Sequence, residues 1–357
     1  MALDIYTPHD LYAVMYDERM EVETSFWLDN YFGASFFSTQ EEILFDKIAT
    51  TRKIAPFMLP NEQGKPIYRR EGERLQSFKP AYTKPKDAVR PSEMLQRQPG
   101  ELVRQGLLSP QARYNAEVIR IAQYHRNSIK RLWDWMAAKA ILDGQITIQY
   151  IGDNGTKGQS VTLDFGRAAG HTVTLGSGSR WGDSGVSIFD LIQSWMDTMS
   201  AAEFGGAAGD LILGSAAYAV FRKDAEIKAL MDKNFRGSED VNINRGLVRK
   251  DVMQPITKVG SLGAGLNVWL YTGTFQANDG SLVNIMDPRD AVLIAPGVEG
   301  VKAFGAILDE DAGLNATDIF SKMWSQPDPS ARFIMSQSAP LMIPVNPNRT
   351  FRARVVA

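Results

Sequence analysis

The feature that most constrains the fold is a long series of side chains at helical spacing between Ser109 and Gly144. The positions on one face are Tyr114, Val118, Ile121, His125, Ile129, Leu132, Met136 and Ile141, which is the pattern of an amphipathic helix. Ser109-Pro110 is a helix start and Gly144 a helix stop. The pattern predicts one helix over residues 110–143, about 50 Å long, which has to cross a whole domain.

Shorter patterns on both sides of this helix alternate between helix and strand. Before it, Thr7-Pro8-His9-Asp10 begins a helix, and strands are predicted at 43–49 and 53–59. After it, the predicted elements are a strand at 145–151, a strand pair within 161–175, a helix at 188–199, a strand at 210–214, a helix within 215–232, a hairpin within 266–287, and strands at 291–296 and at the C-terminus. The mixture predicts an α+β chain.

Composition limits what the chain can be. Its 357 residues exceed the usual size of one core, so two or three lobes are expected. No apolar stretch approaches the ~20 residues that cross a bilayer, and the N-terminus lacks the pattern of a secretory signal, so no membrane association is expected. The absence of cysteine excludes disulfides and thiolate sites.

Residues 60–91 contain five prolines and eight Lys or Arg, with few apolar residues to anchor them to a core. Three interpretations compete: a disordered tether, a nucleic-acid-binding arm, or an extended hairpin that packs on another copy of the chain. Residues 1–48, in contrast, hold ten Asp or Glu against Arg19 and Lys47. The two oppositely charged segments are suited to gripping each other or a neighbouring molecule.

A dedicated nucleic-acid-binding protein is disfavoured. Tyr68, Phe78 and Tyr82 interleave with the basic residues, which is the mixture that stacks bases and neutralises phosphates. Acidic residues dilute the same segment, however, and the sequence pI is near 6.0. A dedicated binder would normally be strongly basic.

A search for catalytic chemistry yields no candidate set. His9, His125 and His171 lie in different predicted elements and without metal-ligand spacing, and no nucleotide-binding glycine motif is present. Asp309-Glu310-Asp311 fits a solvated turn better than paired catalytic carboxylates or a cation site. We therefore predict no enzyme, no cofactor and no bound metal.

Four segments carry a resemblance to a known family: "FKPAYTKPKDAVRP" at 78–91, "VTLDFGR" at 161–167, "KAFGAILDEDAGLNA" at 302–316 and "PDPSARFIMSQSAPLMIPVNP" at 327–347. In their order, and together with the long helix, they resemble the major capsid proteins of tailed phages, specifically the lambda-type capsid protein E family with the Hong Kong 97 fold. The resemblance spans most of the chain.

The resemblance implies a domain plan. It comprises an N-terminal arm (1–48), an extended β-hairpin loop (49–92), a peripheral domain (93–186) with the spine helix 110–143, an α/β axial domain (187–308), and return strands (309–357) that complete the peripheral domain. It implies that the basic hairpin and the aromatic arm find their packing surfaces on neighbouring subunits. The subunit-contact residues are then Arg69, Arg70, Arg74, Lys79, Lys84 and Lys86 of the loop, and Phe26, Trp27, Tyr31 and Phe32 of the arm.

The resemblance also implies a function. Copies of the chain would form hexamers and pentamers of an icosahedral head enclosing a double-stranded DNA genome, which contacts the inner face without sequence specificity. Partners would be other copies, a scaffolding protein, a head protease, a portal and a decoration or cement protein. Assembly would occur in the host bacterial cytoplasm, giving a virion component closed by non-covalent contacts. The alternative is an encapsulin-like nanocompartment shell, which shares the fold but packages enzymes.

Overall fold

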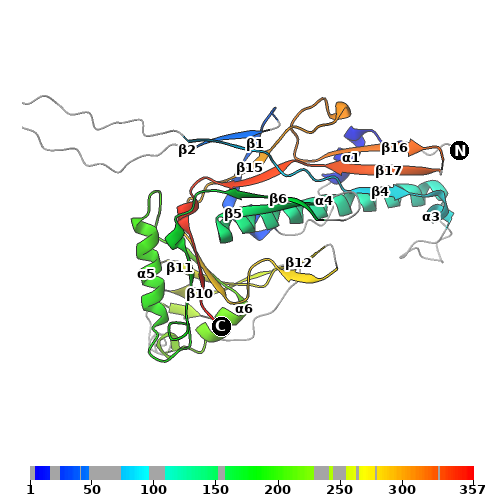
Figure 1. Ribbon diagram of the computed structural model, residues 1–357. Helices are drawn as coiled ribbons and strands as arrows, with labels where there is room; N and C mark the ends of the chain where they lie inside the picture. The colour runs from blue at the N-terminus through cyan, green and yellow to red at the C-terminus, as the bar shows by residue number, and fades with distance from the viewer. Residues whose placement is uncertain are drawn as a thin grey trace, which may run out of the picture.

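The computed structural model describes residues 5–16, 25–40, 42–47, 74–95, 109–151, 157–228, 241–243, 255–262, 265–277, 280–328 and 330–357. The described helices are α1 (Pro8–Met15), α2 (Phe26–Tyr31), α3 (Pro91–Leu95), α4 (Pro110–Asp143), α5 (Ile188–Ala201) and α6 (Ser215–Phe221). Figure 1 shows two lobes. We call the part around α4 the helix lobe and the part that contains α5 and α6 the sheet lobe.

The strands fall into sheets of different size. Those of the helix lobe and its edge are β1 (Phe32–Phe37), β2 (Ile43–Lys47), β3 (Arg74–Phe78), β4 (Lys86–Val89), β5 (Gln145–Ile151), β6 (Lys157–Asp164), β15 (Gly300–Phe304), β16 (Phe320–Gln326), β17 (Ala331–Gln337) and β18 (Pro340–Pro344). The others are β7 (Thr172–Thr174), β8 (Asp210–Leu213), β9 (Val241–Ile243), β10 (Ile256–Leu262), β11 (Leu266–Tyr271), β12 (Thr274–Gln276), β13 (Leu282–Asn284), β14 (Asp290–Ile294) and β19 (Thr350–Arg354).

Helix α4 confirms the predicted long helix at both ends. The Ser109 hydroxyl accepts a hydrogen bond from the backbone N–H of Ala112 at 3.1 Å. Gly144 ends the helix in the left-handed conformation, with φ 67°, and its N–H donates to the carbonyl of Ala140 at 3.1 Å. A Cβ at position 144 would also lie 2.8 Å from the side chain of Arg167. Both backbone conformation and space therefore require glycine here.

Small sheets complete the helix lobe along α4 (Figure 1). β17 pairs antiparallel with both β16 and β4, and β15 lies between parallel β1 and antiparallel β18. β5 and β6 form a hairpin beside the C-terminal half of α4. The prediction of a strand pair within 161–175 is wrong, because β6 pairs with β5 whereas β7 joins β19 in the sheet lobe.

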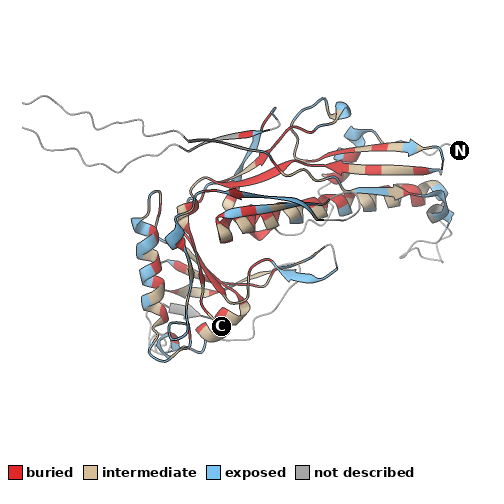
Figure 2. Ribbon diagram, in the orientation of Figure 1, coloured by how far each residue is buried: buried red, intermediate tan, exposed pale blue. Residues whose placement is uncertain are grey.

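A seven-stranded sheet in the order β7-β19-β14-β8-β11-β10-β9 forms the sheet lobe. Successive residues of its central strands point to opposite faces. On β8, Leu211 packs beneath α5 and α6, whereas Ile212 belongs to the core that includes α4. Trp195 of α5 stacks on Phe351 of β19 with ring centroids 5.6 Å apart. Figure 2 shows the buried residues along α4 and the central strands, with exposed residues on the outer face of α5.

Two strands lie in a different lobe from the one that the domain plan implies. β15 falls within the axial segment 187–308, yet it pairs with β1 and β18 beside α4. β19 falls within 309–357, the segment expected to complete the peripheral domain, yet it pairs with β14 and β7 in the sheet lobe. Strand partners far apart in the sequence decide both positions, and local patterns carry no information about them.

The helix predicted within 215–232 is interrupted. α6 ends at Phe221, and the Asp224 side chain accepts hydrogen bonds from the backbone N–H groups of Glu226 and Ile227 at 2.9 and 3.2 Å. A new helical turn follows at 225–228. A short acidic side chain that binds nearby N–H groups favours a cap over a continuous helix. Residues 229–232 lie outside the described ranges.

Candidate functional site

The described loop cations that the family resemblance assigns to subunit contact lie in β3, in β4 and in the segment between these two strands. β3 pairs with β2, and β4 pairs with β17, so residues 79–85 connect two small sheets. Lys79, Lys84 and Lys86 are all exposed. Arg74 lies in β3, whereas Arg69 and Arg70, together with the strand predicted at 53–59, lie outside the described residues.

Aromatic rings of the same chain lie beneath two of these lysines. The Nζ atom of Lys86 is 4.2 Å from the ring centroid of Phe333 and 5.1 Å from that of Trp324. The Nζ atom of Lys84 is 4.7 Å from the ring centroid of Tyr82. Such contacts at exposed sites contribute ~0.5–1 kcal/mol. They orient the ammonium groups without neutralising them, so both lysines retain a positive charge at the surface.

An open hollow of about 370 Å³ lies beside this segment, and we call it the basic hollow. Its lining includes Lys79, Pro80, Tyr82, Lys84, Tyr150 and Leu308. The Tyr82 hydroxyl donates to Gln337 Oε1 at 2.7 Å and accepts from the backbone N–H of Leu308 at 3.2 Å. Burial raises the pKa of Tyr82, so the hydroxyl stays protonated at neutral pH. These two bonds fix the ring that forms part of the wall.

The acidic turn Asp309-Glu310-Asp311 is balanced by a lysine. The Nζ atom of Lys322 lies 2.7 Å from Asp309 Oδ2 and 3.0 Å from Asp311 Oδ2, and Gln337 Nε2 donates to Asp309 Oδ2 at 2.6 Å. Glu310 and Asp311 are exposed, as a solvated turn requires, but only 9% of the Asp309 side chain is. Asp309 therefore anchors the turn, and its two neighbours face solvent.

His125 lies in a series of hydrogen bonds whose order resembles a catalytic triad, and the Asp87 carboxylate at one end of it is 53% exposed. Its Nε2 atom is 2.8 Å from Asp87 Oδ2, its Nδ1 atom is 3.0 Å from Ser336 Oγ, and Ser336 Oγ is 2.8 Å from Ser321 Oγ. Both His125 and Ser336 are completely buried, so no substrate reaches the hydroxyl. Burial lowers the pKa of His125, which keeps the ring neutral at pH 7. This series of hydrogen bonds joins α4 to β4 and β17.

The aromatic residues of the N-terminal arm are covered by their own chain. The ring centroid of Tyr271 on β11 lies 5.1 Å from that of Trp27 and 5.9 Å from that of Phe26. Phe26, Trp27 and Phe32 are buried, and the hydroxyl of half-buried Tyr31 lies 3.5 Å from Asp210 Oδ2. The sequence assigned this cover to a neighbouring subunit. That is wrong for Trp27 and Phe32, which are 0% and 1% exposed within the single chain.

A buried carboxylate of α4 holds this arm in place. Asp134 Oδ1 accepts a hydrogen bond from the backbone N–H of Leu28 in α2 at 3.0 Å. Burial raises the pKa of Asp134 to about 6, although the N–H groups of Leu28 and Trp27 act in the opposite direction. The residue was missed by sequence reasoning, because an acidic residue in a helical pattern normally indicates the solvent face.

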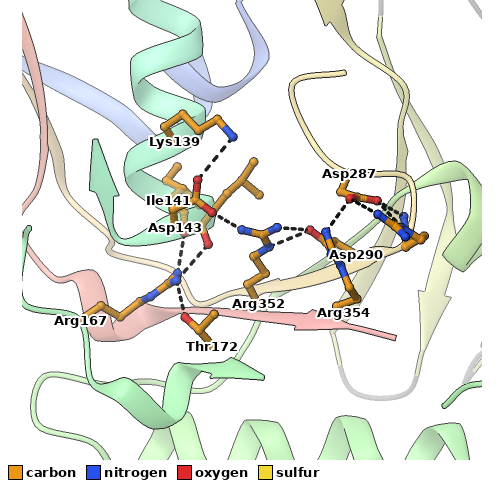
Figure 3. Close-up of polar contacts among 11 residues, drawn as sticks. Lys139, Ile141, Asp143, Arg167, Thr172, Asp287, Asp290, Arg352 and Arg354 are labelled. Atoms are coloured by element: carbon orange, nitrogen blue, oxygen red, sulfur yellow. Dashed lines mark hydrogen bonds and ion pairs between the residues drawn. The ribbon is translucent and has the colours of Figure 1, made fainter. Parts of the chain in front are cut away.

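Alternating charges join the two lobes (Figure 3). Arg352 of β19 contacts Asp143 at the end of α4, and its Nη2 atom lies 2.6 Å from Asp290 Oδ2. Arg354 lies 3.3 Å from Asp290 Oδ1 through Nε and 2.5 Å from Asp287 Oδ2 through Nη2. The Asp290 side chain is 1% exposed, so it depends on these two guanidinium groups for compensation. The face of this strand that carries the two arginines is thus the junction between the lobes.

Arg167 binds the end of α4 in the same region (Figure 3). Its guanidinium donates to the carbonyls of Ile141 and Leu142 at 2.9 and 3.0 Å and to the hydroxyl of Thr172 at 2.7 Å. The last carbonyls of a helix have no partner inside the helix and attract cations. Arg167 therefore satisfies α4 and connects it to the first residue of β7.

The described ranges offer neither of two further kinds of site. They contain no group of three or more His, Asp or Glu side chains arranged to hold a metal ion. No helix in that part of the chain combines the length and apolarity needed to cross a membrane.

Known proteins are similar to this chain in sequence and in fold. Major capsid proteins of Escherichia phage N15 and Escherichia phage lambda are each 27% identical to the chain, in alignments that cover 97% of it and 98% of each relative. The crystal structure of a prophage capsid protein from E. coli CFT073 superposes with a TM-score of 0.70 at 20% identity, covering 99% of this chain and 100% of that one. The fold is therefore the Hong Kong 97-type capsid fold.

The sequence profile of one family, described as phage major capsid protein E, matches residues 18–355. The match includes both lobes, the strands that pass between them, and the exposed lysines between β3 and β4. The chain belongs to the phage major capsid protein E family.

Proposed function

We propose that the chain is the repeating subunit of the icosahedral head of a tailed phage, in which copies assemble as hexamers and pentamers around a double-stranded DNA genome. The observation that carries this proposal is the family match over residues 18–355, supported by relatives named major capsid protein that align along nearly the whole chain. The protein is then a component of the virion that works by self-association.

The extended loop within 49–92 supplies contacts to an adjacent subunit in this proposal. Arg74, Lys79, Lys84 and Lys86, with Arg69 and Arg70, would face acidic groups there. Support comes from the exposure of the three lysines, two of which, Lys84 and Lys86, also have their amines over aromatic rings of the same chain. Each exposed ion pair contributes only ~0–1 kcal/mol, but a shell repeats it at every equivalent interface.

The remaining parts of the proposal rest on the family resemblance. A scaffolding protein, a head protease, a portal and a decoration protein act with the chain during assembly in the cytoplasm of the host bacterium, and DNA contacts the inner face without sequence specificity. The chain has no catalytic turnover. Complete burial of His125 and Ser336 supports this view, because the one triad-like arrangement described above has no access to a substrate.

Expression of the chain in bacteria, followed by electron microscopy, tests the proposal. We expect closed shells built from six-fold and five-fold capsomers, with nucleic acid inside particles recovered from a phage infection. Shells that instead enclose a co-expressed enzyme would favour the encapsulin-like alternative. A chain that stays unassembled when produced with the other head genes of its phage would contradict both.

A further inference from the structure

The loop between β15 and β16 is closed at its base and exposed at its tip. Ala306 and Ala316 form an isolated β-bridge, and the N–H of Ile307 donates to the carbonyl of Asn315 at 3.1 Å. We call residues 308–314 the acidic loop. Its tip carries exposed Glu310 and Asp311. The base is paired and Lys322 holds both Asp309 and Asp311, so the tip is an anchored projection, and the negative charge that Lys322 does not balance is that of Glu310.

Leu314 is the least favourably placed residue of this loop. Its φ of 56° lies in the left-handed region, which costs an apolar residue ~1–2 kcal/mol. It is also 58% exposed, and Leu308 at the other end of the loop is 54% exposed. Local strain of this kind persists only where something else compensates for it. Burial of both leucines in an interface would provide that compensation.

A surface of complementary character lies next to the acidic loop. The basic hollow presents the amines of Lys79 and Lys84, and its Tyr150 is 36% exposed. Leu308 belongs to both features, because it lines the hollow and begins the loop. The Tyr82 hydroxyl also ties the hollow to the loop through the N–H of Leu308. Acidic and basic groups, each with an apolar neighbour, therefore lie side by side on one face.

We propose that the acidic loop of one subunit enters the basic hollow of a second copy of the chain, with Glu310 facing Lys79 and Lys84 and with Leu314 packing on Tyr150. The partner that this surface fits is a second copy of the chain. Two identical patches can bind each other only if each patch carries both complementary halves of the contact. Both halves of the contact are present here, so a two-fold rotation brings each loop to the opposite hollow. The inference rests on the proposed function, since it needs subunits that assemble.

Disulfide trapping tests the contact directly, because the chain has no cysteine of its own. Subunits with Leu314→Cys are mixed with subunits with Tyr150→Cys before assembly, since these two residues are the proposed apolar contact, and the purified particles are oxidised and separated on a non-reducing gel. We expect a covalent dimer that contains one of each subunit. The matched control replaces Leu314→Cys by Leu282→Cys, which changes a leucine that is 76% exposed on β13 of a different hairpin. Its dimer yield should be at least about tenfold lower, the ratio that ~1.4 kcal/mol produces.

Charge exchange provides an independent readout. Glu310→Lys and Lys84→Glu should each lower assembly yield at low salt, and the double variant should restore it, because the pair is reformed with its signs exchanged. Circular dichroism of unassembled subunits checks that these exposed substitutions leave the fold intact.

The outcomes separate the inference from the function on which it rests. Particles that assemble but give no more cross-linked dimer than the Leu282→Cys control overturn the contact and leave the proposed function intact. A double charge variant no better than the worse single variant also overturns it. If the unmodified chain forms no shells even when it is produced with the other head genes of its phage, the proposed function itself is contradicted.

Discussion

Asp134 is predicted to make the subunit less stable as the pH rises. Burial raises its pKa in the folded chain from the usual 3.8 to about 6. The folded chain therefore holds this proton more tightly than the unfolded chain does, and the stability that the neutral carboxyl provides is lost as the pH rises through about 6. About two pKa units correspond to about 3 kcal/mol at full ionisation.

The substitution Asp134→Asn removes the cost of ionising a buried carboxyl group and keeps an oxygen that can accept the hydrogen bond from the N–H of Leu28. The difference in the free energy of unfolding between the variant and the wild type should rise by about 2 kcal/mol from about pH 4.5 to about pH 8. The rise is smaller than the full ~3 kcal/mol because the wild type has already lost part of that stability at the lower pH. The amide nitrogen that replaces the second oxygen adds a constant penalty of ~1–3 kcal/mol if it finds no partner. The change with pH is thus the informative quantity.

Urea unfolding of unassembled subunits, followed by tryptophan fluorescence at several pH values, provides the measurement. Asp197→Asn is the matched control, since it removes one carboxylate from the exposed face of α5. A difference between Asp134→Asn and wild type that stays constant across the pH range would refute the reasoning. So would the same change with pH in the control.

Three further predictions concern the junction, the loop and the buried histidine. Arg352→Leu should lower the free energy of unfolding by about 3–5 kcal/mol, because it leaves the carboxylate of Asp290 buried with one partner fewer, and a loss below about 1 kcal/mol would contradict this. Reversal of Arg69, Arg70 and Arg74 to Glu should reduce assembly yield most at low salt, while the free energy of unfolding of single subunits hardly changes. If the triple variant and the wild type assemble equally well at low salt, contact of these arginines with DNA is indicated instead. Because burial lowers the pKa of His125, the stability that the neutral ring provides is present above about pH 6.5 and is lost as the pH falls below it. His125→Gln should remove that part of the acid sensitivity in urea unfolding, and an unchanged pH profile would argue against it.

Local signals explain why α4 could be predicted to its first and last residue. Ser109, Pro110 and Gly144 act on backbone groups within four positions of themselves, so sequence spacing contains the information. The alternation on the last strand is equally local. Phe351 and Ala353 are buried, and Arg352 and Arg354 point the other way.

Partners far apart in the sequence explain what was missed. The cover of Trp27 comes from Tyr271, and the hydrogen-bond partners of His125 come from Asp87 and Ser336. No spacing rule relates such positions. The sequence could indicate that Trp27 needs cover and that His125 is packed, but it could not identify the residues involved. The same limit applies to Asp290, whose role depends on two arginines more than 60 positions away.

The pairing of β1 with β15 has a consequence for how the subunit is made. Phe32 and Gly300 are register partners, so a ribosome must add about 270 residues after Phe32 before its strand can pair. At ~5–20 residues per second, this takes roughly 15 to 50 s. Until Tyr271 and Gly300 have been added, Trp27 lacks its contact with Tyr271 and Phe32 lacks its strand partner, and such exposed apolar surface is prone to aggregate. We therefore expect the subunit to be most prone to aggregation while its C-terminal strands are still being synthesised.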